Sequence, residues 1–229
     1  MDRIIKLFQN KKLLAAAILL VLFLLFTLLV KVTDVMPIGP EDSLVGFSAL
    51  NEAWHKLTGV NMGWYYITQV LGYFAIALAA FFAVMGVLQL IWRKSVKKVD
   101  RDILLLGALY LVVIIFYIFF EKVAVNYRPI LLKGVLEPSY PSSHTMLAVT
   151  VFVTAFMQFR RRVKNKNIRI GIMAGLTLLL VLTVIGRLFC GVHWFTDIIG
   201  GLLLSGGLVM LYSYFEEKVL MGKGRENAK

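Results

Sequence analysis

The sequence has 229 residues, of which 59% are hydrophobic, and its mean hydropathy is +0.80. A soluble domain of this length is far less apolar, so the composition excludes a soluble globular protein and indicates an integral membrane protein. The formal net charge of +12 is compatible with nucleic-acid binding, but the positions of the basic residues along the chain favour another explanation, given below.

Six apolar segments are long enough to cross the hydrocarbon core as helices: 13–30, 66–92, 103–120, 144–159, 170–187 and 195–215. A span needs about 17 to 25 apolar residues, because a helix satisfies its own backbone polar groups in lipid. The first segment follows basic residues, as a signal peptide does, but no small-x-small cleavage site follows it, so we expect it to remain as a span. The sequence therefore predicts an all-α, polytopic protein with a bundle of six transmembrane helices.

Basic residues gather on one side of this arrangement. With six spans, the N-terminus, the loops 93–102 and 160–169 and the C-terminal tail share one side, which holds 19 of the 25 Lys and Arg residues. The positive-inside rule makes that side cytoplasmic, so both termini are expected inside a bacterial cell membrane. The loops 31–65, 121–143 and 188–194 then face outward. We interpret the basic runs as topology signals and expect no nucleic-acid partner.

The chain is expected to form one domain over residues 1–229, without an obligate protein partner. In loop 31–65, apolar residues are spaced by three or four positions, namely Leu44, Phe47, Leu50, Trp54 and Leu57. This spacing predicts a short external amphipathic helix, capped by Asp42 or Ser43, that lies in the outer interface. His55 falls on its polar side, where a solvated residue is expected.

Two other features of the sequence favour a structural interpretation. The last apolar segment carries several small residues between Gly200 and Gly207, which predict close helix packing inside the monomer rather than a dimer contact. The single cysteine, Cys190, excludes an intramolecular disulfide and is interpreted as a small buried residue.

Chemistry-bearing residues cluster at the outer ends of the later segments. Pro129 keeps Arg128 out of a helix, so this arginine is expected in an extended turn along the outer rim. Lys122 ends the third segment, where it either snorkels to the surface or joins Arg128. Ser142 and Ser143 open the fourth segment, where backbone N–H groups, hydroxyls and the helix dipole form an anion site. Both serines also suit a capping role.

Three further residues surround the start of the last segment. His193 and Asp197 are four positions apart, so the aspartate can reach the imidazole Nδ1 and leave Nε2 free. Arg187 has a fixed fork of donors that suits phosphate oxygens.

His144, at a membrane-embedded helix end, needs a polar partner. A metal site is the competing interpretation of two histidines and an aspartate, but the neighbouring cations Lys122, Arg128 and Arg187 favour an anion.

These motifs resemble the three-part signature of the type 2 phosphatidic acid phosphatase family. They are Lys122 with Arg128-Pro129, then Pro141-Ser142-Ser143-His144, then Arg187 with His193 and Asp197. Membrane members of the family have six spans and an external active site, and the bacterial phosphatidylglycerophosphate phosphatases of the B type resemble the chain most. The chain departs from the signature in three places: Lys122 and Arg128 enclose five residues instead of six, Gly186 replaces serine, and Ser143 replaces glycine.

The resemblance implies a role for each residue of the motifs. His193 is the nucleophile that forms a phosphohistidine, Asp197 orients it, and His144 is the general acid and then the base. The phosphate oxygens are held by Lys122, Arg128, Arg187, Ser142 and the backbone of Ser143, without a metal or other cofactor. The implied activity is that of a lipid phosphate phosphatase.

The position of the site beside the hydrocarbon favours a lipid phosphate substrate. Phosphatidylglycerophosphate and undecaprenyl diphosphate are the expected substrates, and a phosphatidic acid phosphatase of broad specificity is the alternative. A non-enzymatic anion transporter is a different class, but it needs polar residues deep inside several spans, which are nearly continuous in apolar residues. A scaffold that binds lipid without turnover is a third possibility, against which the complete set of His144, His193 and Asp197 argues.

Overall fold

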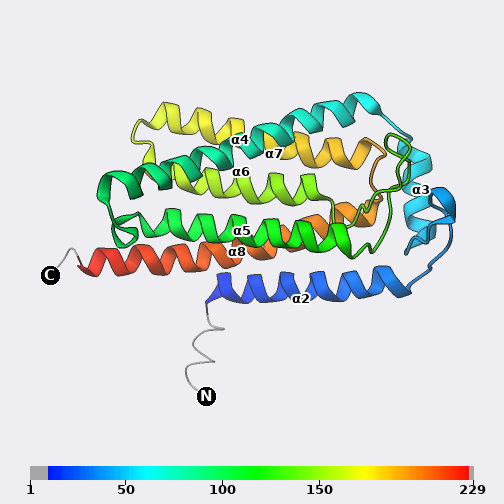
Figure 1. The fold of residues 1–229 in the computed structure, drawn as a ribbon, viewed down its shortest axis with the longest axis horizontal. Helices are drawn as coiled ribbons and strands as arrows, with labels where there is room; N and C mark the ends of the chain where they lie inside the picture. The colour runs from blue at the N-terminus through cyan, green and yellow to red at the C-terminus, as the bar shows by residue number, and fades with distance from the viewer. Residues whose placement is uncertain (1–9, 227–229) are drawn as a thin grey trace, which may run out of the picture.

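The computed structural model describes residues 10–226, with side chains up to Met221, and these residues form an antiparallel helical bundle (Figure 1). The long helices are α2 (Lys11–Val32), α4 (Met62–Arg93), α5 (Arg101–Lys122), α6 (Ser143–Arg162), α7 (Lys166–Phe189) and α8 (Phe195–Glu226). The shorter elements are α3 (Ser48–Thr58) and the single turns η1 (Pro40–Asp42) and η2 (Val96–Lys98). In the described part of the chain, extended pairing is limited to isolated bridges. The predicted all-α fold is confirmed.

Five of these helices are long and apolar enough to cross a membrane: α2, α4, α5, α7 and the part of α8 up to Met221. α6 is not among them, although its 20 residues cover the predicted fourth span. It buries nine of those residues, whereas α4 buries five of 32. Because protein surrounds α6, it can carry buried polar residues such as Thr154, whose Oγ1 donates to the carbonyl of Thr150 at 2.7 Å. The chain is a multi-pass membrane protein, and the count of six spans remains a prediction.

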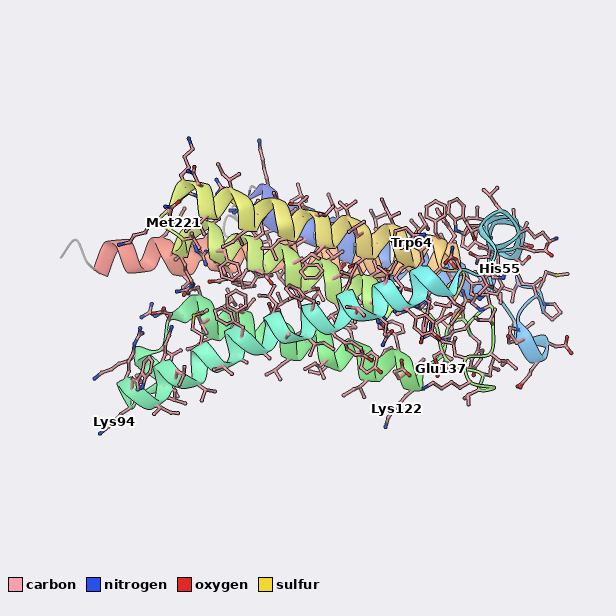
Figure 2. All side chains as sticks on the ribbon, turned by 90° about the horizontal axis from the view of Figure 1, so that it is seen from above. His55, Trp64, Lys94, Lys122, Glu137 and Met221 are labelled. Atoms are coloured by element: carbon pink, nitrogen blue, oxygen red, sulfur yellow. The ribbon has the colours of Figure 1, made fainter. Side chains whose placement is uncertain are left out.

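The basic loops lie together at one end of the bundle, which we call the basic end (residues 93–102 and 160–169, the start of α2 and the last turns of α8). Lys12 Nζ lies 3.0 Å from Glu217 Oε2, so the start of α2 and the end of α8 meet there. Figure 2 shows Lys94 at this end and Glu137 and His55 at the opposite end. Arg3, Lys6 and Lys229, and the side chains of Lys223 and Arg225, lie outside what the structure describes.

The loop between α2 and α4 differs from the prediction in where its helix begins. α3 starts at Ser48, and Phe47 before it has a left-handed backbone (φ 49°), so Leu44 and Phe47 are not helical. The predicted cap by Asp42 or Ser43 is wrong. Asp34 takes that place: its Oδ2 accepts the N–H of Ala49 at 2.7 Å, and its carbonyl accepts that of Ser48. A residue distant in sequence therefore fixes the start of α3.

α3 lies across the end of the bundle opposite the basic end (Figure 1). Trp54 packs against the rings of Phe189 and Phe195, and its Nε1 donates to the carbonyl of Leu188 at 3.0 Å. His55 is half-buried against the ring of Trp194, and its Nδ1 is buried without a hydrogen-bond partner. The expected solvated position of His55 is wrong, because the α3 face that carries it packs on the loop before α8.

The small residues of α8 pack inside the chain, as predicted. A Cβ at Gly200 would lie 2.5 Å from the ring of Tyr140, and one at Gly207 would lie 2.7 Å from the side chain of Leu20 on α2. Any larger side chain at these positions would push apart α8 and its neighbours. The glycines thus allow α8 to approach both α2 and the segment that precedes α6.

Candidate active site

Two loops and the helix ends beside them meet at the end of the bundle that α3 covers, which we call the site end. α5 ends at Lys122, and the loop 123–142 leads to α6. α7 ends at Phe189, and the short loop 190–194 leads to α8. The motifs singled out in the sequence occupy these junctions. They lie at the opposite end of the bundle from the basic loops.

His193 and Asp197 lie together in the protein interior, with exposed fractions of 4% and 0%. His193 Nδ1 is 3.4 Å from Asp197 Oδ2, in contact but not aligned for a hydrogen bond. The same carboxylate oxygen accepts the backbone N–H of Trp194 at 2.9 Å. The predicted approach of the aspartate to the imidazole is therefore present. His193 itself belongs to the loop, and only Asp197 is helical.

The other imidazole nitrogen of His193 faces Arg128. Arg128 Nη1 lies 3.2 Å from His193 Nε2. An arginine only donates, so Nε2 accepts, and the imidazole proton belongs on Nδ1, toward Asp197. Burial of the His193 ring, followed by the charges of Arg128 and Arg187, lowers its pKa well below the ordinary value of 6.5. The imidazole is thus held neutral, with a lone pair on Nε2.

Arg128 lies outside any helix, as the following Pro129 predicts. Its backbone N–H donates to the carbonyl of Glu137 at 3.0 Å, which fixes the loop as an extended turn. Its Nε donates to Glu137 Oε2 at 2.9 Å, and its Nη1 also donates to the carbonyl of Val192 at 3.3 Å. These contacts hold the guanidinium against the loop that carries His193.

Arg187 is the largest fully buried side chain of the described residues, with 1% of its surface exposed. Its Nη2 donates to Gln69 Oε1 at 3.2 Å, and its guanidinium lies over the ring of Tyr65, 5.5 Å from the centroid. Its Nε is buried without a hydrogen-bond partner. No ion pair with a carboxylate is found for Arg187 in the part of the chain that the structure describes. A buried cation without a counter-ion is costly, so the arrangement favours a bound anion.

Gly186 explains how Arg187 reaches this position. A Cβ at Gly186 would lie 2.5 Å from Thr68 Cγ2 and 2.9 Å from the ring of Trp64, both on α4. The serine of the family signature would not fit here unless the side chains of Thr68 and Trp64 moved. The glycine lets α7 approach α4 closely and brings Arg187 to Gln69.

The segment Pro141-Ser142-Ser143-His144 forms the start of α6. Ser142 is buried and is the N-cap residue: its Oγ accepts from Thr145 N at 3.4 Å and from Thr145 Oγ1 at 3.0 Å. Its N–H donates to the carbonyl of Asp197 at 2.9 Å, which ties the second motif to the third. The capping interpretation of Ser142 is confirmed, and its contact with phosphate stays a prediction. Ser143 and His144 are half-buried in the first helical turn.

A cavity of about 360 Å³ lies beside His144, between α4, α5 and α6. It adjoins a narrow cleft that His193, Arg128 and Ser143 line, because Ser143 and Tyr117 belong to both. His144 and His193 thus line neighbouring pockets that share part of their walls. A larger apolar groove of about 730 Å³ continues from the cavity between α4 and α5. Its lining includes Ile76 and Ile114, which also line the cavity.

Lys122 is not brought together with the other residues of the first motif. It is exposed at the end of α5, and Figure 2 shows its side chain pointing away from the bundle. Cys190 is buried and its thiol donates to the carbonyl of Arg187 at 3.3 Å, as expected of a structural cysteine. A search of the described residues finds no group of three or more His, Cys, Asp or Glu side chains that could hold a metal ion.

The sequence did not single out several residues that contact the site. Glu137 pairs with Arg128, Gln69 accepts from Arg187, and Asn126 approaches Asp197. Asn126 lies inside the first motif and Glu137 lies between the first and second motifs. This closeness to the motifs is the only feature of the sequence that points to them. Gln69 is a polar residue in a segment expected to face lipid, and this was the signal that could have identified it.

The comparisons agree with the motifs. Residues 122–220 match the family model of the PAP2 superfamily, which covers the three motifs and most of α8. No curated protein matches the chain. The resemblance predicted from Lys122 to Asp197 is therefore confirmed.

Two solved structures are similar to the chain. One is described as the first transmembrane PAP2 type phosphatidylglycerolphosphate phosphatase from Bacillus subtilis. It is 20% identical, with a TM-score of 0.65, and the match covers 89% of this chain and 96% of that one. The other is LpxE of Aquifex aeolicus, at 23% identity, a TM-score of 0.41, and coverage of 72% and 96%. The first likeness establishes the fold, which is that of a transmembrane protein.

Proposed function

We propose that this chain, in which residues 122–220 carry a PAP2 superfamily region, is a membrane phosphatase that hydrolyses lipid phosphates through a phosphohistidine. The observation that carries the proposal is the buried arrangement of Arg187, which lacks a counter-ion, near a neutral His193 whose Nε2 faces Arg128. Arg128 and His193 line one cleft, and the buried Arg187 lies close enough to His193 for its charge to lower the pKa of the imidazole. Two cations near an imidazole lone pair suit a phosphate group.

In the first step, His193 Nε2 attacks the phosphorus of the bound ester. The N–P bond forms as the P–O bond to the lipid breaks, and His144 donates a proton to the departing oxygen. In the second step His144 takes a proton from water, the water oxygen attacks phosphorus, and the N–P bond breaks to release phosphate. Asp197 stabilises the positive charge that develops on the His193 ring.

Arg128 and Arg187 hold the phosphate oxygens through both steps. Both are fixed before substrate binds, Arg128 by Glu137 and the carbonyl of Val192, and Arg187 by Gln69. Preorganised donors stabilise the charge of the transition state without reorganisation during the reaction. We propose no metal for this chemistry.

A lipid substrate is supported by the groove beside His144. The cavity of about 360 Å³ continues into the apolar groove between α4 and α5, so a phosphate at the histidines can keep its hydrocarbon tails between helices. Phosphatidylglycerophosphate is the first candidate, because the Bacillus protein of this fold is named for it. Undecaprenyl diphosphate and phosphatidic acid suit the same geometry.

The proposed topology places this site on the outer face of a bacterial cell membrane, with both termini in the cytoplasm. The basic end gathers the loops 93–102 and 160–169, which supports a cytoplasmic assignment for that end. The site end then meets the outer leaflet.

The test is phosphate release by the purified protein in detergent, in the presence of a chelator. The substrates are phosphatidylglycerophosphate, phosphatidic acid and undecaprenyl diphosphate, each at several concentrations. We expect release from at least one lipid and none from the His193→Ala variant, which also forms no acid-labile phosphoenzyme. No release from any lipid would contradict the function, and a requirement for added metal would contradict the mechanism.

A further inference from the structure

Asn126 is a buried amide side chain in the loop between α5 and α6, with 1% of its surface exposed. It lies two residues before Arg128, but among the described residues its side chain bonds neither Arg128 nor Arg187. Its backbone carbonyl accepts the N–H of Ser139 at 2.9 Å and the hydroxyl of Ser139 at 3.2 Å. Two bonds to one carbonyl fix the backbone of Asn126.

The amide of Asn126 reaches the carboxylate behind His193. Its Nδ2 lies 3.5 Å from Asp197 Oδ1 and 3.4 Å from Thr196 Oγ1, and its Oδ1 accepts the N–H of Gly46 at 3.4 Å. The bond from Gly46 fixes which end of the amide is oxygen, because a backbone N–H needs an acceptor. The NH₂ group of Asn126 therefore faces Asp197.

The two oxygens of Asp197 are thus divided between different partners. Oδ2 accepts the N–H of Trp194 at 2.9 Å and faces His193 Nδ1, while Oδ1 is met by Asn126. The hydroxyl of Ser139 also interacts with this carboxylate. Partners on both oxygens restrict rotation of the carboxylate about its terminal bond. Its orientation sets the direction in which Oδ2 meets the imidazole.

We propose that Asn126 is a positioning residue that acts on His193 through Asp197. The inference rests on the proposed function, in which His193 is the nucleophile. Among the described residues, the side chain of Asn126 bonds Gly46, Thr196 and Asp197 and neither arginine, so its contribution belongs to the chemical step and not to binding of the lipid. Loss of its amide donor leaves Oδ1 of a buried carboxylate without this partner and lets the carboxylate turn.

Asn51 provides a matched control in the same polar network. It is also fully buried, and its side chain bonds Thr196 and Gly46: Nδ2 donates to Gly46 O at 2.7 Å, and Oδ1 accepts Thr196 N at 3.2 Å. No bond joins Asn51 to Asp197 among the described residues. It holds the N-terminus of α8 from α3, one residue away from the carboxylate.

The experiment compares kcat, KM and pH profiles of Asn126→Ala, Asn126→Ser, Asn126→Asp and Asn51→Asp with the unchanged protein. We expect Asn126→Ala to lower kcat by about ten- to hundredfold with KM within about twofold, because a small misplacement of reacting groups costs that much. Asn126→Ser, which keeps a hydroxyl donor, should recover part of the loss. The rate of phosphoenzyme formation in a single turnover should fall in parallel with kcat.

The Asn126→Asp variant gives the distinguishing signature. The charged groups around this position are Asp197, His193 and Arg128. A second carboxyl beside Asp197 donates a bond only while it is protonated, so kcat should fall by about tenfold as pH rises from about 6 to 8, beyond any change in the unchanged protein. Asn51→Asp lacks this contact and should keep the ordinary profile, with a lowered thermal midpoint only.

The outcomes separate this inference from the proposed function. If the unchanged protein releases no phosphate, the proposed function fails. If it is active while Asn126→Ala and Asn126→Asp retain its kcat and pH profile, the positioning role is wrong. If kcat falls equally in the variants of Asn126 and Asn51, and the pH profile of kcat gains no new limb in Asn126→Asp, both residues act in folding alone. This result would also overturn the inference. Should Asn126→Asp not fold, the order of kcat among Asn, Ser and Ala decides.

Discussion

The arginines at the two ends of the bundle have opposite surroundings. At the basic end, Arg161 lies 2.7 Å from Glu216 Oε1 and 3.1 Å from Asp102 Oδ2. Arg162 lies 2.6 Å from the same Asp102 oxygen. At the site end, Arg187 is more deeply buried, but only the neutral Gln69 accepts from it.

This difference separates structural charges from functional ones. Arg161 and Arg162 join α6 to α5 and α8, and Tyr212 adds a hydroxyl bond to Glu216 at 2.7 Å. Arg161 and Arg162 pair there with Asp102 and Glu216. Arg187 has no such complement among the described residues, which favours a counter-charge from a ligand. The paired charges at the basic end therefore hold helices together, whereas the unpaired charge of Arg187 favours binding of an anion.

The largest expected effect concerns Arg187 and distinguishes its role from that of Arg161. Arg187→Met should lower kcat/KM by roughly 10²- to 10³-fold, because it removes a fixed donor for the transition-state oxygens. It should leave the free energy of unfolding unchanged or raise it, since it removes a buried charge without a partner. Phosphate release and thermal unfolding in the same detergent measure both quantities.

Arg161→Met is the matched variant at the basic end. It leaves Glu216 without its ion pair, so unfolding free energy should fall by about 1 to 2 kcal/mol, a modest amount because the arginine is partly exposed. Its kcat/KM should stay within about twofold at a temperature where the protein is folded. If Arg187→Met instead destabilised the protein without loss of turnover, the contrast between the ends would be wrong.

A second prediction concerns the protonation of His193 at the site end and the pH dependence of kcat/KM that follows from it. Its pKa is lowered by burial and by Arg128 and Arg187, so the acid limb of kcat/KM should lie below pH 6.5. Arg128→Met removes one positive charge, raises this pKa and should move the limb toward 6.5, in addition to lowering the rate. Profiles of kcat/KM between pH 4 and 8 measure the shift.

The same group affects stability with a defined sign. The unfolded chain binds a proton on His193 more readily than the folded one, so stability is fully present above pH 6.5 and is lost progressively as pH falls from 6.5 toward the lowered pKa of the folded state. An acid limb for the unchanged protein above pH 6.5 would mean that the ring is not held neutral before substrate binds.

The parts of this structure that the sequence predicts are those that depend on local spacing. The four-residue interval of His193 and Asp197 brings them together because α8 begins between them. Pro129 keeps Arg128 out of a helix wherever the surrounding loop goes. Apolar length alone identifies the five helices that can cross a membrane, whereas α6 is defined by the protein around it.

Contacts between distant segments were beyond prediction. Asp34 caps α3 because a left-handed Phe47 turns the chain toward it, and no local pattern encodes that turn. A buried asparagine such as Asn126 looks in sequence like an ordinary turn residue. The free Nε of Arg187 is visible only once α4 has been packed against α7.

The smallest expected effect concerns Lys122, the member of the first motif that the structure leaves outside the site. Lys122→Met should change kcat/KM by less than about threefold, because its side chain points into solvent and its charge is screened there. Lys31→Met is the matched control, since both lysines are exposed in the last turn of their helix. Both effects should shrink as salt is raised from about 0.05 to 0.5 M.

A hundredfold loss at Lys122 with none at Lys31 would contradict this expectation. It would mean that α5 unwinds or turns at its end when substrate binds, so that Lys122 joins Arg128 as the family motif implies. The site end would then hold three cations around one phosphate, and the phosphate would balance the charge of Lys122 as well as that of Arg187. The salt dependence distinguishes the two cases, because a lysine that contacts buried phosphate is screened far less than one in solvent.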